Sequence, residues 1–300
     1  MTNRIIDIQD TGAFIHYSNQ LLVIKKRDNE ESTVPVEEIG VLILANPAAT
    51  ITQQAIAAVC HAKGMVVICG TNHHPAGMFM PVSMHSNSAK NIELQAAVTL
   101  PLKKRLWQTI VQAKIRFQSQ LLFSQYKDDQ GIGKLASGVK SGDPENREAQ
   151  AAQKYWHLIF ADKDFRRNRD GEDQNRFLNY GYTVLRACTA RAVCAAGLHP
   201  SFGLHHHNQY NPFRLADDIM EPFRPLVDRK VIEILLNNEK TVPFNKELRQ
   251  KLLEIITDTI MLEGENVSIF QALIRCAVSL LHVYEKKTKS LVLPDSLLFE

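Results

Sequence analysis

The sequence predicts an α+β protein in which a small β-rich domain is followed by a larger, all-α domain. Two observations support this. Short runs of Val, Ile and Leu, bounded by polar or Gly/Pro turns, fill the first third of the chain. From about residue 92 onward, apolar residues recur at helical spacing instead. The polar, unperiodic stretch 85–91 (HSNSAKN) is interpreted as a linker, which gives domains of residues 1–87 and 88–300.

Strands in the first domain are indicated by β-branched and aliphatic runs between turn residues. They are expected at 4–8 (RIIDI), 21–26 (LLVIKK), 40–44 (GVLIL) and 64–69 (GMVVIC), with one more at 78–83 (MFMPVS). The segment 51–64 (ITQQAIAAVCHAKG) has its apolar residues at helical spacing and is expected to be a helix.

Helices in the second domain are expected over 102–122, 143–160, 173–197 and 268–287. Asp143 is interpreted as the N-cap of the second of these, with Pro144 at its first helical position. The third is expected to end at Gly197. The first has an apolar stripe, and its basic residues lie outside that stripe: Lys103, Lys104, Arg105, Lys114 and Arg116.

Composition bounds the class of protein. With 300 residues, 45% hydrophobic and 22% charged, the chain is globular. No apolar run approaches the roughly 20 residues that a membrane helix needs, so a cytoplasmic protein is expected. Five scattered cysteines without a CxxC pair exclude a zinc ribbon and favour reduced, packed thiols. The GIGK of residues 131–134 lacks the spacing of a phosphate-binding P-loop, which excludes an NTPase of that kind.

Positive charge is concentrated in one part of a nearly neutral chain. The net charge is +3, but residues 101–169 hold 14 Lys or Arg against 7 Asp or Glu, a surplus of 7. The rest of the chain therefore sums to −4. A local basic surface is typical of proteins that bind phosphate backbones, and a solvated helical face remains the alternative.

The stretch 202–226 (FGLHHHNQYNPFRLADDIMEPFRPL) gathers imidazoles and carboxylates. Adjacent histidines cannot all face one way, so at most two of residues 205–207 can face one site. Asp217 and Asp218 lie four and three residues before Glu221, and Pro222 interrupts the helix at that point. Imidazole with carboxylates suits Mn²⁺ or Mg²⁺. The alternative is a polar loop followed by a helix that starts with acidic residues.

Longer motifs connect these features to a known family. They are GDPENREAQAAQKYW (142–156), LNYGYTVLRA (178–187), the run from Gly197 to Asp228, PVEEIGVLILANPAATIT (35–52) and HHPAGMFMPVS (73–83). Together they resemble Cas1, the universal integrase of CRISPR adaptation, and are most similar to the form that accompanies type II systems. The resemblance covers essentially the whole chain.

The resemblance implies a β-sandwich-like N-terminal domain that serves dimerisation and a helical catalytic domain. It further implies a homodimer that joins a small ferredoxin-like partner, Cas2, in a heterohexamer, and a link to the type II effector nuclease. It places a Mg²⁺ or Mn²⁺ ion on Glu148, His206 and Glu221. The three consecutive histidines leave His205 as an alternative to His206.

The reaction implied is metal-dependent joining of the 3′-hydroxyl ends of short foreign DNA to a CRISPR repeat by transesterification. Two alternatives stay open: a metal-dependent nuclease or branched-DNA resolvase, and a catalytically silent DNA-binding scaffold. The candidate contacts to double-stranded DNA are Arg166, Arg167, Arg169, Lys103, Lys104, Arg105 and Arg224. For Arg224, an ion pair with Asp217 or Asp228 is the alternative. Tyr180 and Tyr182 fit a core position better than base stacking.

Overall fold

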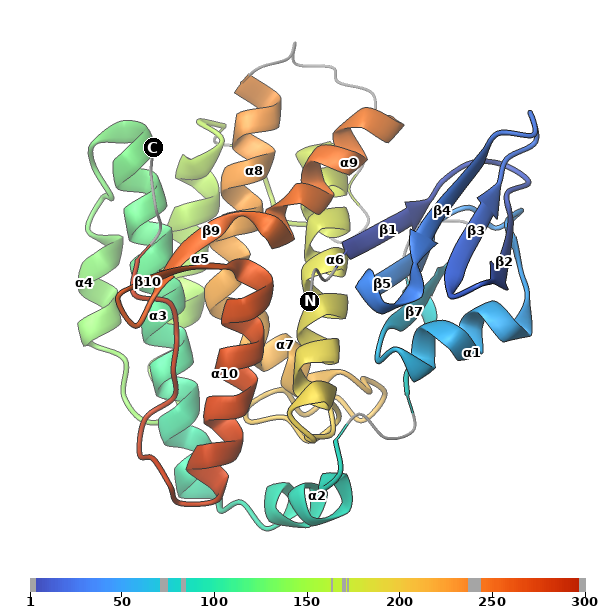
Figure 1. Cartoon of the computed structure of the whole chain (residues 1–300). Coiled ribbons are helices and arrows are strands. Elements are labelled where there is room, and N and C mark those ends of the chain that lie inside the picture. The colour runs from blue at the N-terminus through green and yellow to red at the C-terminus, as the bar shows by residue number, and fades with distance from the viewer. Residues whose placement is uncertain are drawn as a thin grey trace. The chain divides into compact units, whose positions relative to one another are not determined.

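The computed structural model describes residues 4–70, 75–81, 85–162, 164–168, 171, 173–236 and 244–296. The chain divides into two compact units, Met1–Ser86 and Asn87–Glu300. The first consists mainly of strands and the second mainly of helices (Figure 1). This confirms the predicted α+β class. The candidate DNA contact Arg169 and the two histidines that open the HHPAGMFMPVS motif, His73 and His74, lie outside the described residues.

The first unit contains two four-stranded sheets. One has the order β1 (Arg4–Ile8), β5 (Ile39–Leu44), β7 (Met65–Cys69) and β8 (Pro75–Phe79). The other has the order β4 (Glu31–Pro35), β3 (Leu21–Lys25), β2 (Phe14–Ser18) and β6 (Thr50–Ile51). Helix α1 (Gln53–His61) packs against β2 of one sheet and β7 of the other. One core is shared by both sheets and the helix, for example Ile15 and Leu22 with Leu42, Val66 and Val59, all fully buried. The predicted sandwich-like arrangement is thus present.

The second unit contains nine helices in its described part. They are α2 (Ser88–Ala96), α3 (Leu100–Tyr126), α4 (Ile132–Ser137), α5 (Arg147–Ile159), α6 (Gln174–Ala195), α7 (Arg214–Met220), α8 (Arg224–Leu236), α9 (Lys246–Glu254) and α10 (Ile269–Tyr284). A hairpin of β9 (Thr259–Leu262) and β10 (Glu265–Ser268) precedes α10. Helix α6 lies at the centre and packs against α7, α8, α9 and α10. Among the described residues, no helix combines the length and the apolarity that a membrane span requires.

Three sequence-based assignments, one of them in the first unit, are wrong. The presumed linker 85–91 runs into α2, because Asn91 and Gln95 turn inward and donate hydrogen bonds to the carbonyls of Ala196 and His199 at 3.4 and 3.0 Å. The Gly- and Ser-rich segment 131–142, where the sequence indicates a connection and no helix, contains the short helix α4. The strand expected over 78–83 ends at Phe79.

The helix expected from residue 143 begins at Arg147. Asp143 and Asn146 have left-handed backbones, with φ of +50° and +54°, which helical residues do not adopt. Asp143 nevertheless caps the helix, because its carboxylate accepts hydrogen bonds from the backbone N–H of Arg147 at 2.9 Å and of Glu148 at 3.0 Å. This cap fixes the first turn of α5, which carries Glu148.

Helices α6 and α8 approach closely at Gly181. A Cβ atom placed there would lie 2.5 Å from Val227 Cγ1, well inside van der Waals contact. We expect Gly181→Ala to lower the free energy of unfolding by about 1–2 kcal/mol, because overpacking outweighs the gain in helix propensity. Urea unfolding followed by circular dichroism measures this.

The matched test is the same substitution in a Val227→Ala background. That variant removes the methyl group that the new Cβ would meet, so Gly181→Ala should there be neutral or stabilising. An equal loss of stability in both backgrounds would show that the close approach to Val227 is not the reason for the glycine.

Candidate active site

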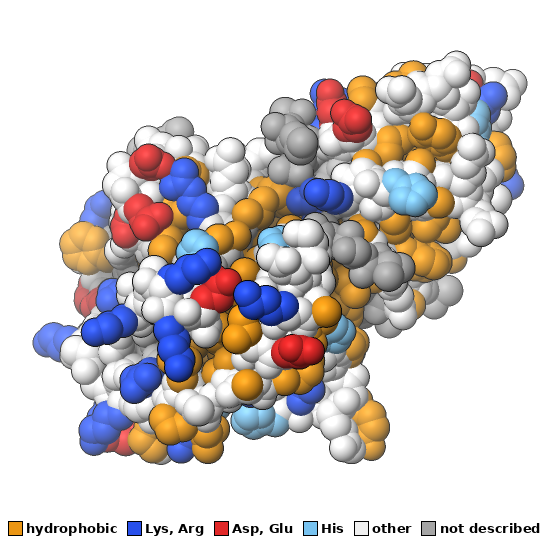
Figure 2. All heavy atoms as spheres, turned by 60° about the horizontal axis from the view of Figure 1, so that its bottom comes forward, with side chains coloured by type: hydrophobic (Ala, Val, Ile, Leu, Met, Phe, Trp, Pro, Cys, Tyr) orange, Lys and Arg blue, Asp and Glu red, His pale blue; other side chains and the backbone are white. Residues whose placement is uncertain are grey.

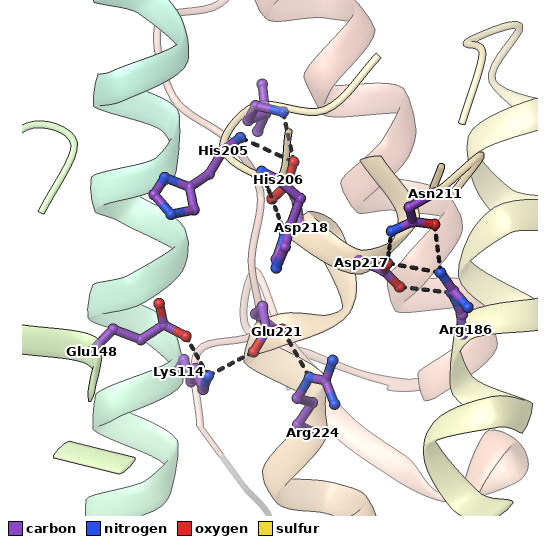
Figure 3. A network of polar contacts seen from close by, with 11 residues as sticks. Lys114, Glu148, Arg186, His205, His206, Asn211, Asp217, Asp218, Glu221 and Arg224 are labelled. Atoms are coloured by element: carbon purple, nitrogen blue, oxygen red, sulfur yellow. Dashed lines mark hydrogen bonds and ion pairs between the residues drawn. The ribbon is translucent and has the colours of Figure 1, made fainter. Parts of the chain in front are cut away.

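Two carboxylates from different elements converge on one lysine. Lys114 Nζ lies 2.6 Å from Glu148 Oε1 and 2.6 Å from Glu221 Oε2. Lys114 comes from the middle of α3, Glu148 from the first turn of α5, and Glu221 from the short 3₁₀ turn Glu221–Phe223 between α7 and α8. Figure 3 shows the two glutamates pointing toward the ammonium group from different sides. Residues 73 positions apart, 148 and 221, are thereby brought to one site, as the resemblance implied.

Glu221 is buried, with 4% of its surface exposed. Its Oε1 accepts a hydrogen bond from Arg224 Nε at 2.9 Å. Its Oε2 lies beside the Lys114 ammonium but has no partner in hydrogen-bond geometry. Burial would raise the pKa of Glu221, but the positive charges of Arg224 and Lys114 outweigh it and lower that pKa to about 2. Glu221 is therefore an anion whose two oxygens face two different cations, Arg224 and Lys114.

Lys114 is buried as well, and its side chain is 11% exposed. Burial would lower its pKa, but the charges of Glu221 and Glu148 raise it above the ordinary value. The predicted break at Pro222 is present, since α7 ends at Met220 and α8 begins at Arg224. The break in the helix does not expose Glu221, because the turn that carries it faces α3 and not solvent.

Asp218 organises the histidine loop from within the protein. It is fully buried, and its carboxylate accepts hydrogen bonds from the backbone N–H of Leu204 at 2.6 Å and of His205 and His206 at 3.2 Å each. The same carboxylate lies 2.6 Å from His206 Nδ1. Gly203 is needed for this turn, because a Cβ there would lie 2.7 Å from the His206 carbonyl oxygen. The loop is thus held in one conformation.

His205 and His206 differ in their surroundings. The His205 ring stacks on the buried Trp107, with ring centroids 4.2 Å apart and an interplanar angle of 2°. The hydrogen bond to Asp218 is the main cause of the raised pKa of His206, and the charge of Glu221 raises it further. Burial lowers the pKa of His205. Of the two histidines, His206 is therefore the one that contacts Asp218 and whose pKa is raised by the charge of Glu221.

Among the described residues, no three His, Cys, Asp or Glu side chains are assembled so that they could hold a metal ion together. Glu148 and Glu221 meet at Lys114, whereas His206 meets Asp218. Lys114 and Trp107 take part in the site without having been singled out as functional from the sequence, and Asp218, noted there beside Glu221, contacts His206 instead. From the sequence alone, Lys114 is indistinguishable from the surface lysines of the same helix. Only the tertiary structure shows that it is buried.

Known proteins share both the sequence and the fold of this chain. The pattern of the family "CRISPR associated protein Cas1" matches residues 6–263. The CRISPR-associated endonuclease Cas1 of Neisseria meningitidis serogroup C is 36% identical over 300 residues, covering 99% of this chain and 97% of that protein. The chain belongs to the Cas1 family of CRISPR-associated endonucleases.

Solved structures agree with Cas1 membership at the level of the fold. A casposase bound to its integration product superposes with a TM-score of 0.79 at 20% identity, covering 97% of this chain and 92% of that one. A chain of a Cas6-RT-Cas1–Cas2 complex superposes with a TM-score of 0.75 at 21% identity, covering 96% of this chain and 36% of that one. The two units described above are therefore the Cas1 fold.

Two of the arginines that follow α5 in this Cas1 chain, Arg166 and Arg167, make internal contacts. Arg167 donates hydrogen bonds to Asn175 Oδ1 at 2.8 Å and to Asn179 Oδ1 at 2.7 Å. Arg166 Nη1 donates to the Phe165 carbonyl at 2.9 Å and lies 3.2 Å from His157 Nδ1. On the face shown in Figure 2, Lys and Arg side chains gather over the helical unit, among fewer acidic ones. On α3, Lys104 and Arg105 are exposed and Lys103 is half-buried.

The alternatives proposed for Arg224 are not realised. Its guanidinium pairs with Glu221, and its Cζ lies 4.6 Å from the centre of the Tyr182 ring. Asp217 pairs with Arg186 at 2.7 Å instead, and also accepts a hydrogen bond from Asn211 at 2.6 Å. Figure 3 shows the two pairs as separate parts of one network. Arg224 thus stands beside the candidate site with its charge directed at a buried carboxylate.

Near the candidate site, a buried carboxylate joins three helices. Asp228 of α8 accepts hydrogen bonds from the hydroxyls of Tyr155 on α5, at 2.8 Å, and Tyr182 on α6. All three residues are buried, and Tyr180 is buried as well. The core interpretation of Tyr180 and Tyr182 is thereby confirmed. The network ties α8, which follows Glu221, to α5, which carries Glu148.

Asp228 should make the stability of this protein depend on pH. Burial raises its pKa to about 6, although the two tyrosine hydroxyls act in the opposite direction. The unfolded value is about 3.9, so a raised folded pKa contributes stability below pH 4 that is lost as the pH rises through 6. The difference amounts to about 3 kcal/mol. We expect Asp228→Asn to flatten this part of the pH profile.

The measurement is urea unfolding of wild type and Asp228→Asn between pH 4 and pH 7.5. Other groups titrate equally in both proteins, so the difference between the two curves isolates Asp228. Parallel curves would contradict a raised pKa at this position.

Proposed function

We propose that this chain is a divalent-metal-dependent DNA integrase. It joins the 3′-hydroxyl ends of short foreign DNA fragments to phosphodiesters at the ends of a CRISPR repeat. The observation that carries the proposal is the convergence of Glu148 and Glu221 on one cation, 2.6 Å from each. Two anionic side chains from separate elements, held around a single positive charge, are a natural place for Mg²⁺ or Mn²⁺.

His206 is proposed as the third ligand. A metal-binding histidine commonly donates its other ring N–H to a carboxylate, which fixes the tautomer and the ring orientation. With Nδ1 donating to Asp218, Nε2 is the nitrogen left for a ligand. The stacking of His205 on Trp107 favours His206 over its neighbour. Two carboxylates and one imidazole are donor types that suit Mg²⁺ or Mn²⁺, and this supports the ion that the Cas1 resemblance implies.

When bound, the ion supplies positive charge to the phosphate under attack and lowers the pKa of the attacking hydroxyl. Glu148, His206 and Glu221 hold it, and Asp218 keeps the imidazole in the ligating tautomer. Arg224 adds positive charge beside a phosphate whose negative charge grows during attack. One phosphodiester forms between the incoming 3′-oxygen and the repeat, and one breaks with its own 3′-oxygen leaving. No water is consumed and no nucleotide hydrolysis is needed.

The assembly proposed is a homodimer joined to Cas2, acting on double-stranded DNA in the cytoplasm. It is supported by the fold likeness to a chain of a Cas6-RT-Cas1–Cas2 complex and to a casposase bound to its integration product. The N-terminal unit is proposed to form the dimer, which supplies two sites, one for each DNA end. Lys103, Lys104, Arg105, Arg166, Arg167, Arg169 and Arg224 remain the proposed DNA contacts, and the type II effector nuclease is a further proposed partner.

A joining assay tests the function. Purified protein, with and without Cas2, is given labelled 3′-hydroxyl duplexes, a supercoiled repeat-bearing plasmid and Mn²⁺ or Mg²⁺. We expect label joined covalently to the plasmid, and no joining with 3′-blocked DNA or with chelator. Cleavage without joining would favour the nuclease or resolvase. DNA binding without any chemistry would favour the scaffold.

A further inference from the structure

We propose that Lys114 is a tethered cation that competes with the divalent ion for Glu148 and Glu221 and so sets how tightly the protein binds the metal. This inference rests on the metal dependence proposed above and adds to it a residue that is not itself a ligand. In the structure, the ammonium group takes the position between the two carboxylates.

The competition follows from distances. Lys114 Nζ is 2.6 Å from an oxygen of each glutamate, so those two oxygens are at most 5.2 Å apart (2.6 + 2.6). Mg²⁺ bonds to carboxylate oxygens at about 2.1 Å, so an ion that touches either oxygen lies within about 4.7 Å of the ammonium group. At that separation a monovalent and a divalent cation repel each other strongly in a poorly solvated site. Metal binding must therefore displace the ammonium group or proceed against its charge.

The side chain of Lys114 can move away from the carboxylates, but its backbone cannot. The backbone of Lys114 lies in the middle of α3, and its neighbours Val111, Ile115 and Phe117 are buried. Glu221 keeps a second cation, Arg224, at 2.9 Å from its other oxygen. Displacement of the lysine thus leaves Glu221 partly balanced and its Oε2, which lacks a hydrogen bond, available to the ion. The lysine holds the two carboxylates together until the metal arrives.

Metal affinity of the full-length protein tests this directly. Lys114→Met keeps an unbranched side chain of similar length and removes the charge. We expect it to bind Mn²⁺ at least tenfold more tightly than wild type in isothermal titration calorimetry and in Mn²⁺ electron paramagnetic resonance. Lys114→Arg should stay close to wild type because it keeps the charge. Arg116→Met, which removes an exposed cation from the same helix, is the matched control and should not change the affinity.

Stability gives a second expectation for the same variant. Without the ammonium group, Glu148 and Glu221 repel each other, so metal-free Lys114→Met should melt below wild type. Mn²⁺ should raise its melting temperature by more than it raises that of wild type. Equal or weaker Mn²⁺ binding by Lys114→Met, with wild type binding normally, would overturn the competition and leave the proposed function intact.

If Lys114→Met does not fold, the wild-type protein carries the test. Reductive methylation followed by mass spectrometry reports how accessible each lysine is. We expect Lys114 to be protected in the metal-free protein and modified several-fold faster with saturating Mn²⁺. Unchanged protection would overturn the proposal. If no variant binds Mn²⁺, the competition is also wrong, and the joining assay with chelator shows separately whether integration needs a metal.

Discussion

Replacing Glu221 by glutamine should lower the rate of DNA joining at least about a hundredfold while the protein still folds. The amide has nearly the shape of the carboxylate but no charge, and it cannot attract a divalent ion between itself and Glu148. Glu148→Gln should have a similar effect, because the proposed site needs both anions. The double variant should be hardly slower than either single one, since residues that act as a unit are not additive.

Folding must be measured beside the chemistry, because Glu221 is also structural. Its loss leaves Lys114 and Arg224 with one partner fewer in a buried setting, which should cost about 1–3 kcal/mol of unfolding free energy. Circular dichroism and urea unfolding therefore accompany the joining assay. Glu93→Gln, which changes an exposed glutamate of α2, is the matched control. Normal joining by Glu221→Gln would remove this residue from the proposed mechanism.

Long helices and hydrophobic strands were predictable from the sequence because periodicity reports them directly. Helices α3, α6 and α10 and strands β1, β3, β5 and β7 lie where apolar spacing places them. Strand β4 was missed because its residues, ESTVP, are mostly exposed and polar, and it pairs only with β3 at the edge of its sheet. The β9–β10 hairpin was missed because its two-residue turn is Glu263-Gly264, both with positive φ, and not the more familiar Asn-Gly.

The site was predictable only in part, for a physical reason. Long motifs resembling Cas1 imply Glu148, His206 and Glu221 as ligands, and the structure brings the two glutamates to one lysine. What the sequence does not contain is the direction in which a side chain points. Lys114 lies outside the apolar stripe of α3, so it reads as solvated, yet it is buried because α5 and the Glu221 turn cover that side of the helix. The three-residue spacing predicts that Asp218 lies on the same helix face as Glu221, yet its carboxylate points toward the histidine loop.

That orientation of Asp218 leads to the second large expected effect. Asp218→Asn should weaken Mn²⁺ binding and joining about 10- to 100-fold, the range measured when residues that orient metal ligands are changed. Three backbone N–H groups and the His206 ring converge on this carboxylate. An asparagine carries one NH₂ group in place of an acceptor, so at least one buried donor would face another donor.

A merely structural role for Asp218 would lower stability but leave the pH dependence of the surviving activity unchanged. As a positioning residue acting through His206, it should do more. Its hydrogen bond raises the pKa of His206, so its removal should move the acidic limb of the joining profile to lower pH. Asp128→Asn, in the exposed turn after α3, is the control and should match wild type. An Asp218→Asn protein with wild-type Mn²⁺ affinity and an unshifted pH profile would show that His206 does not depend on this carboxylate, and the ligand set proposed here would have to be reconsidered.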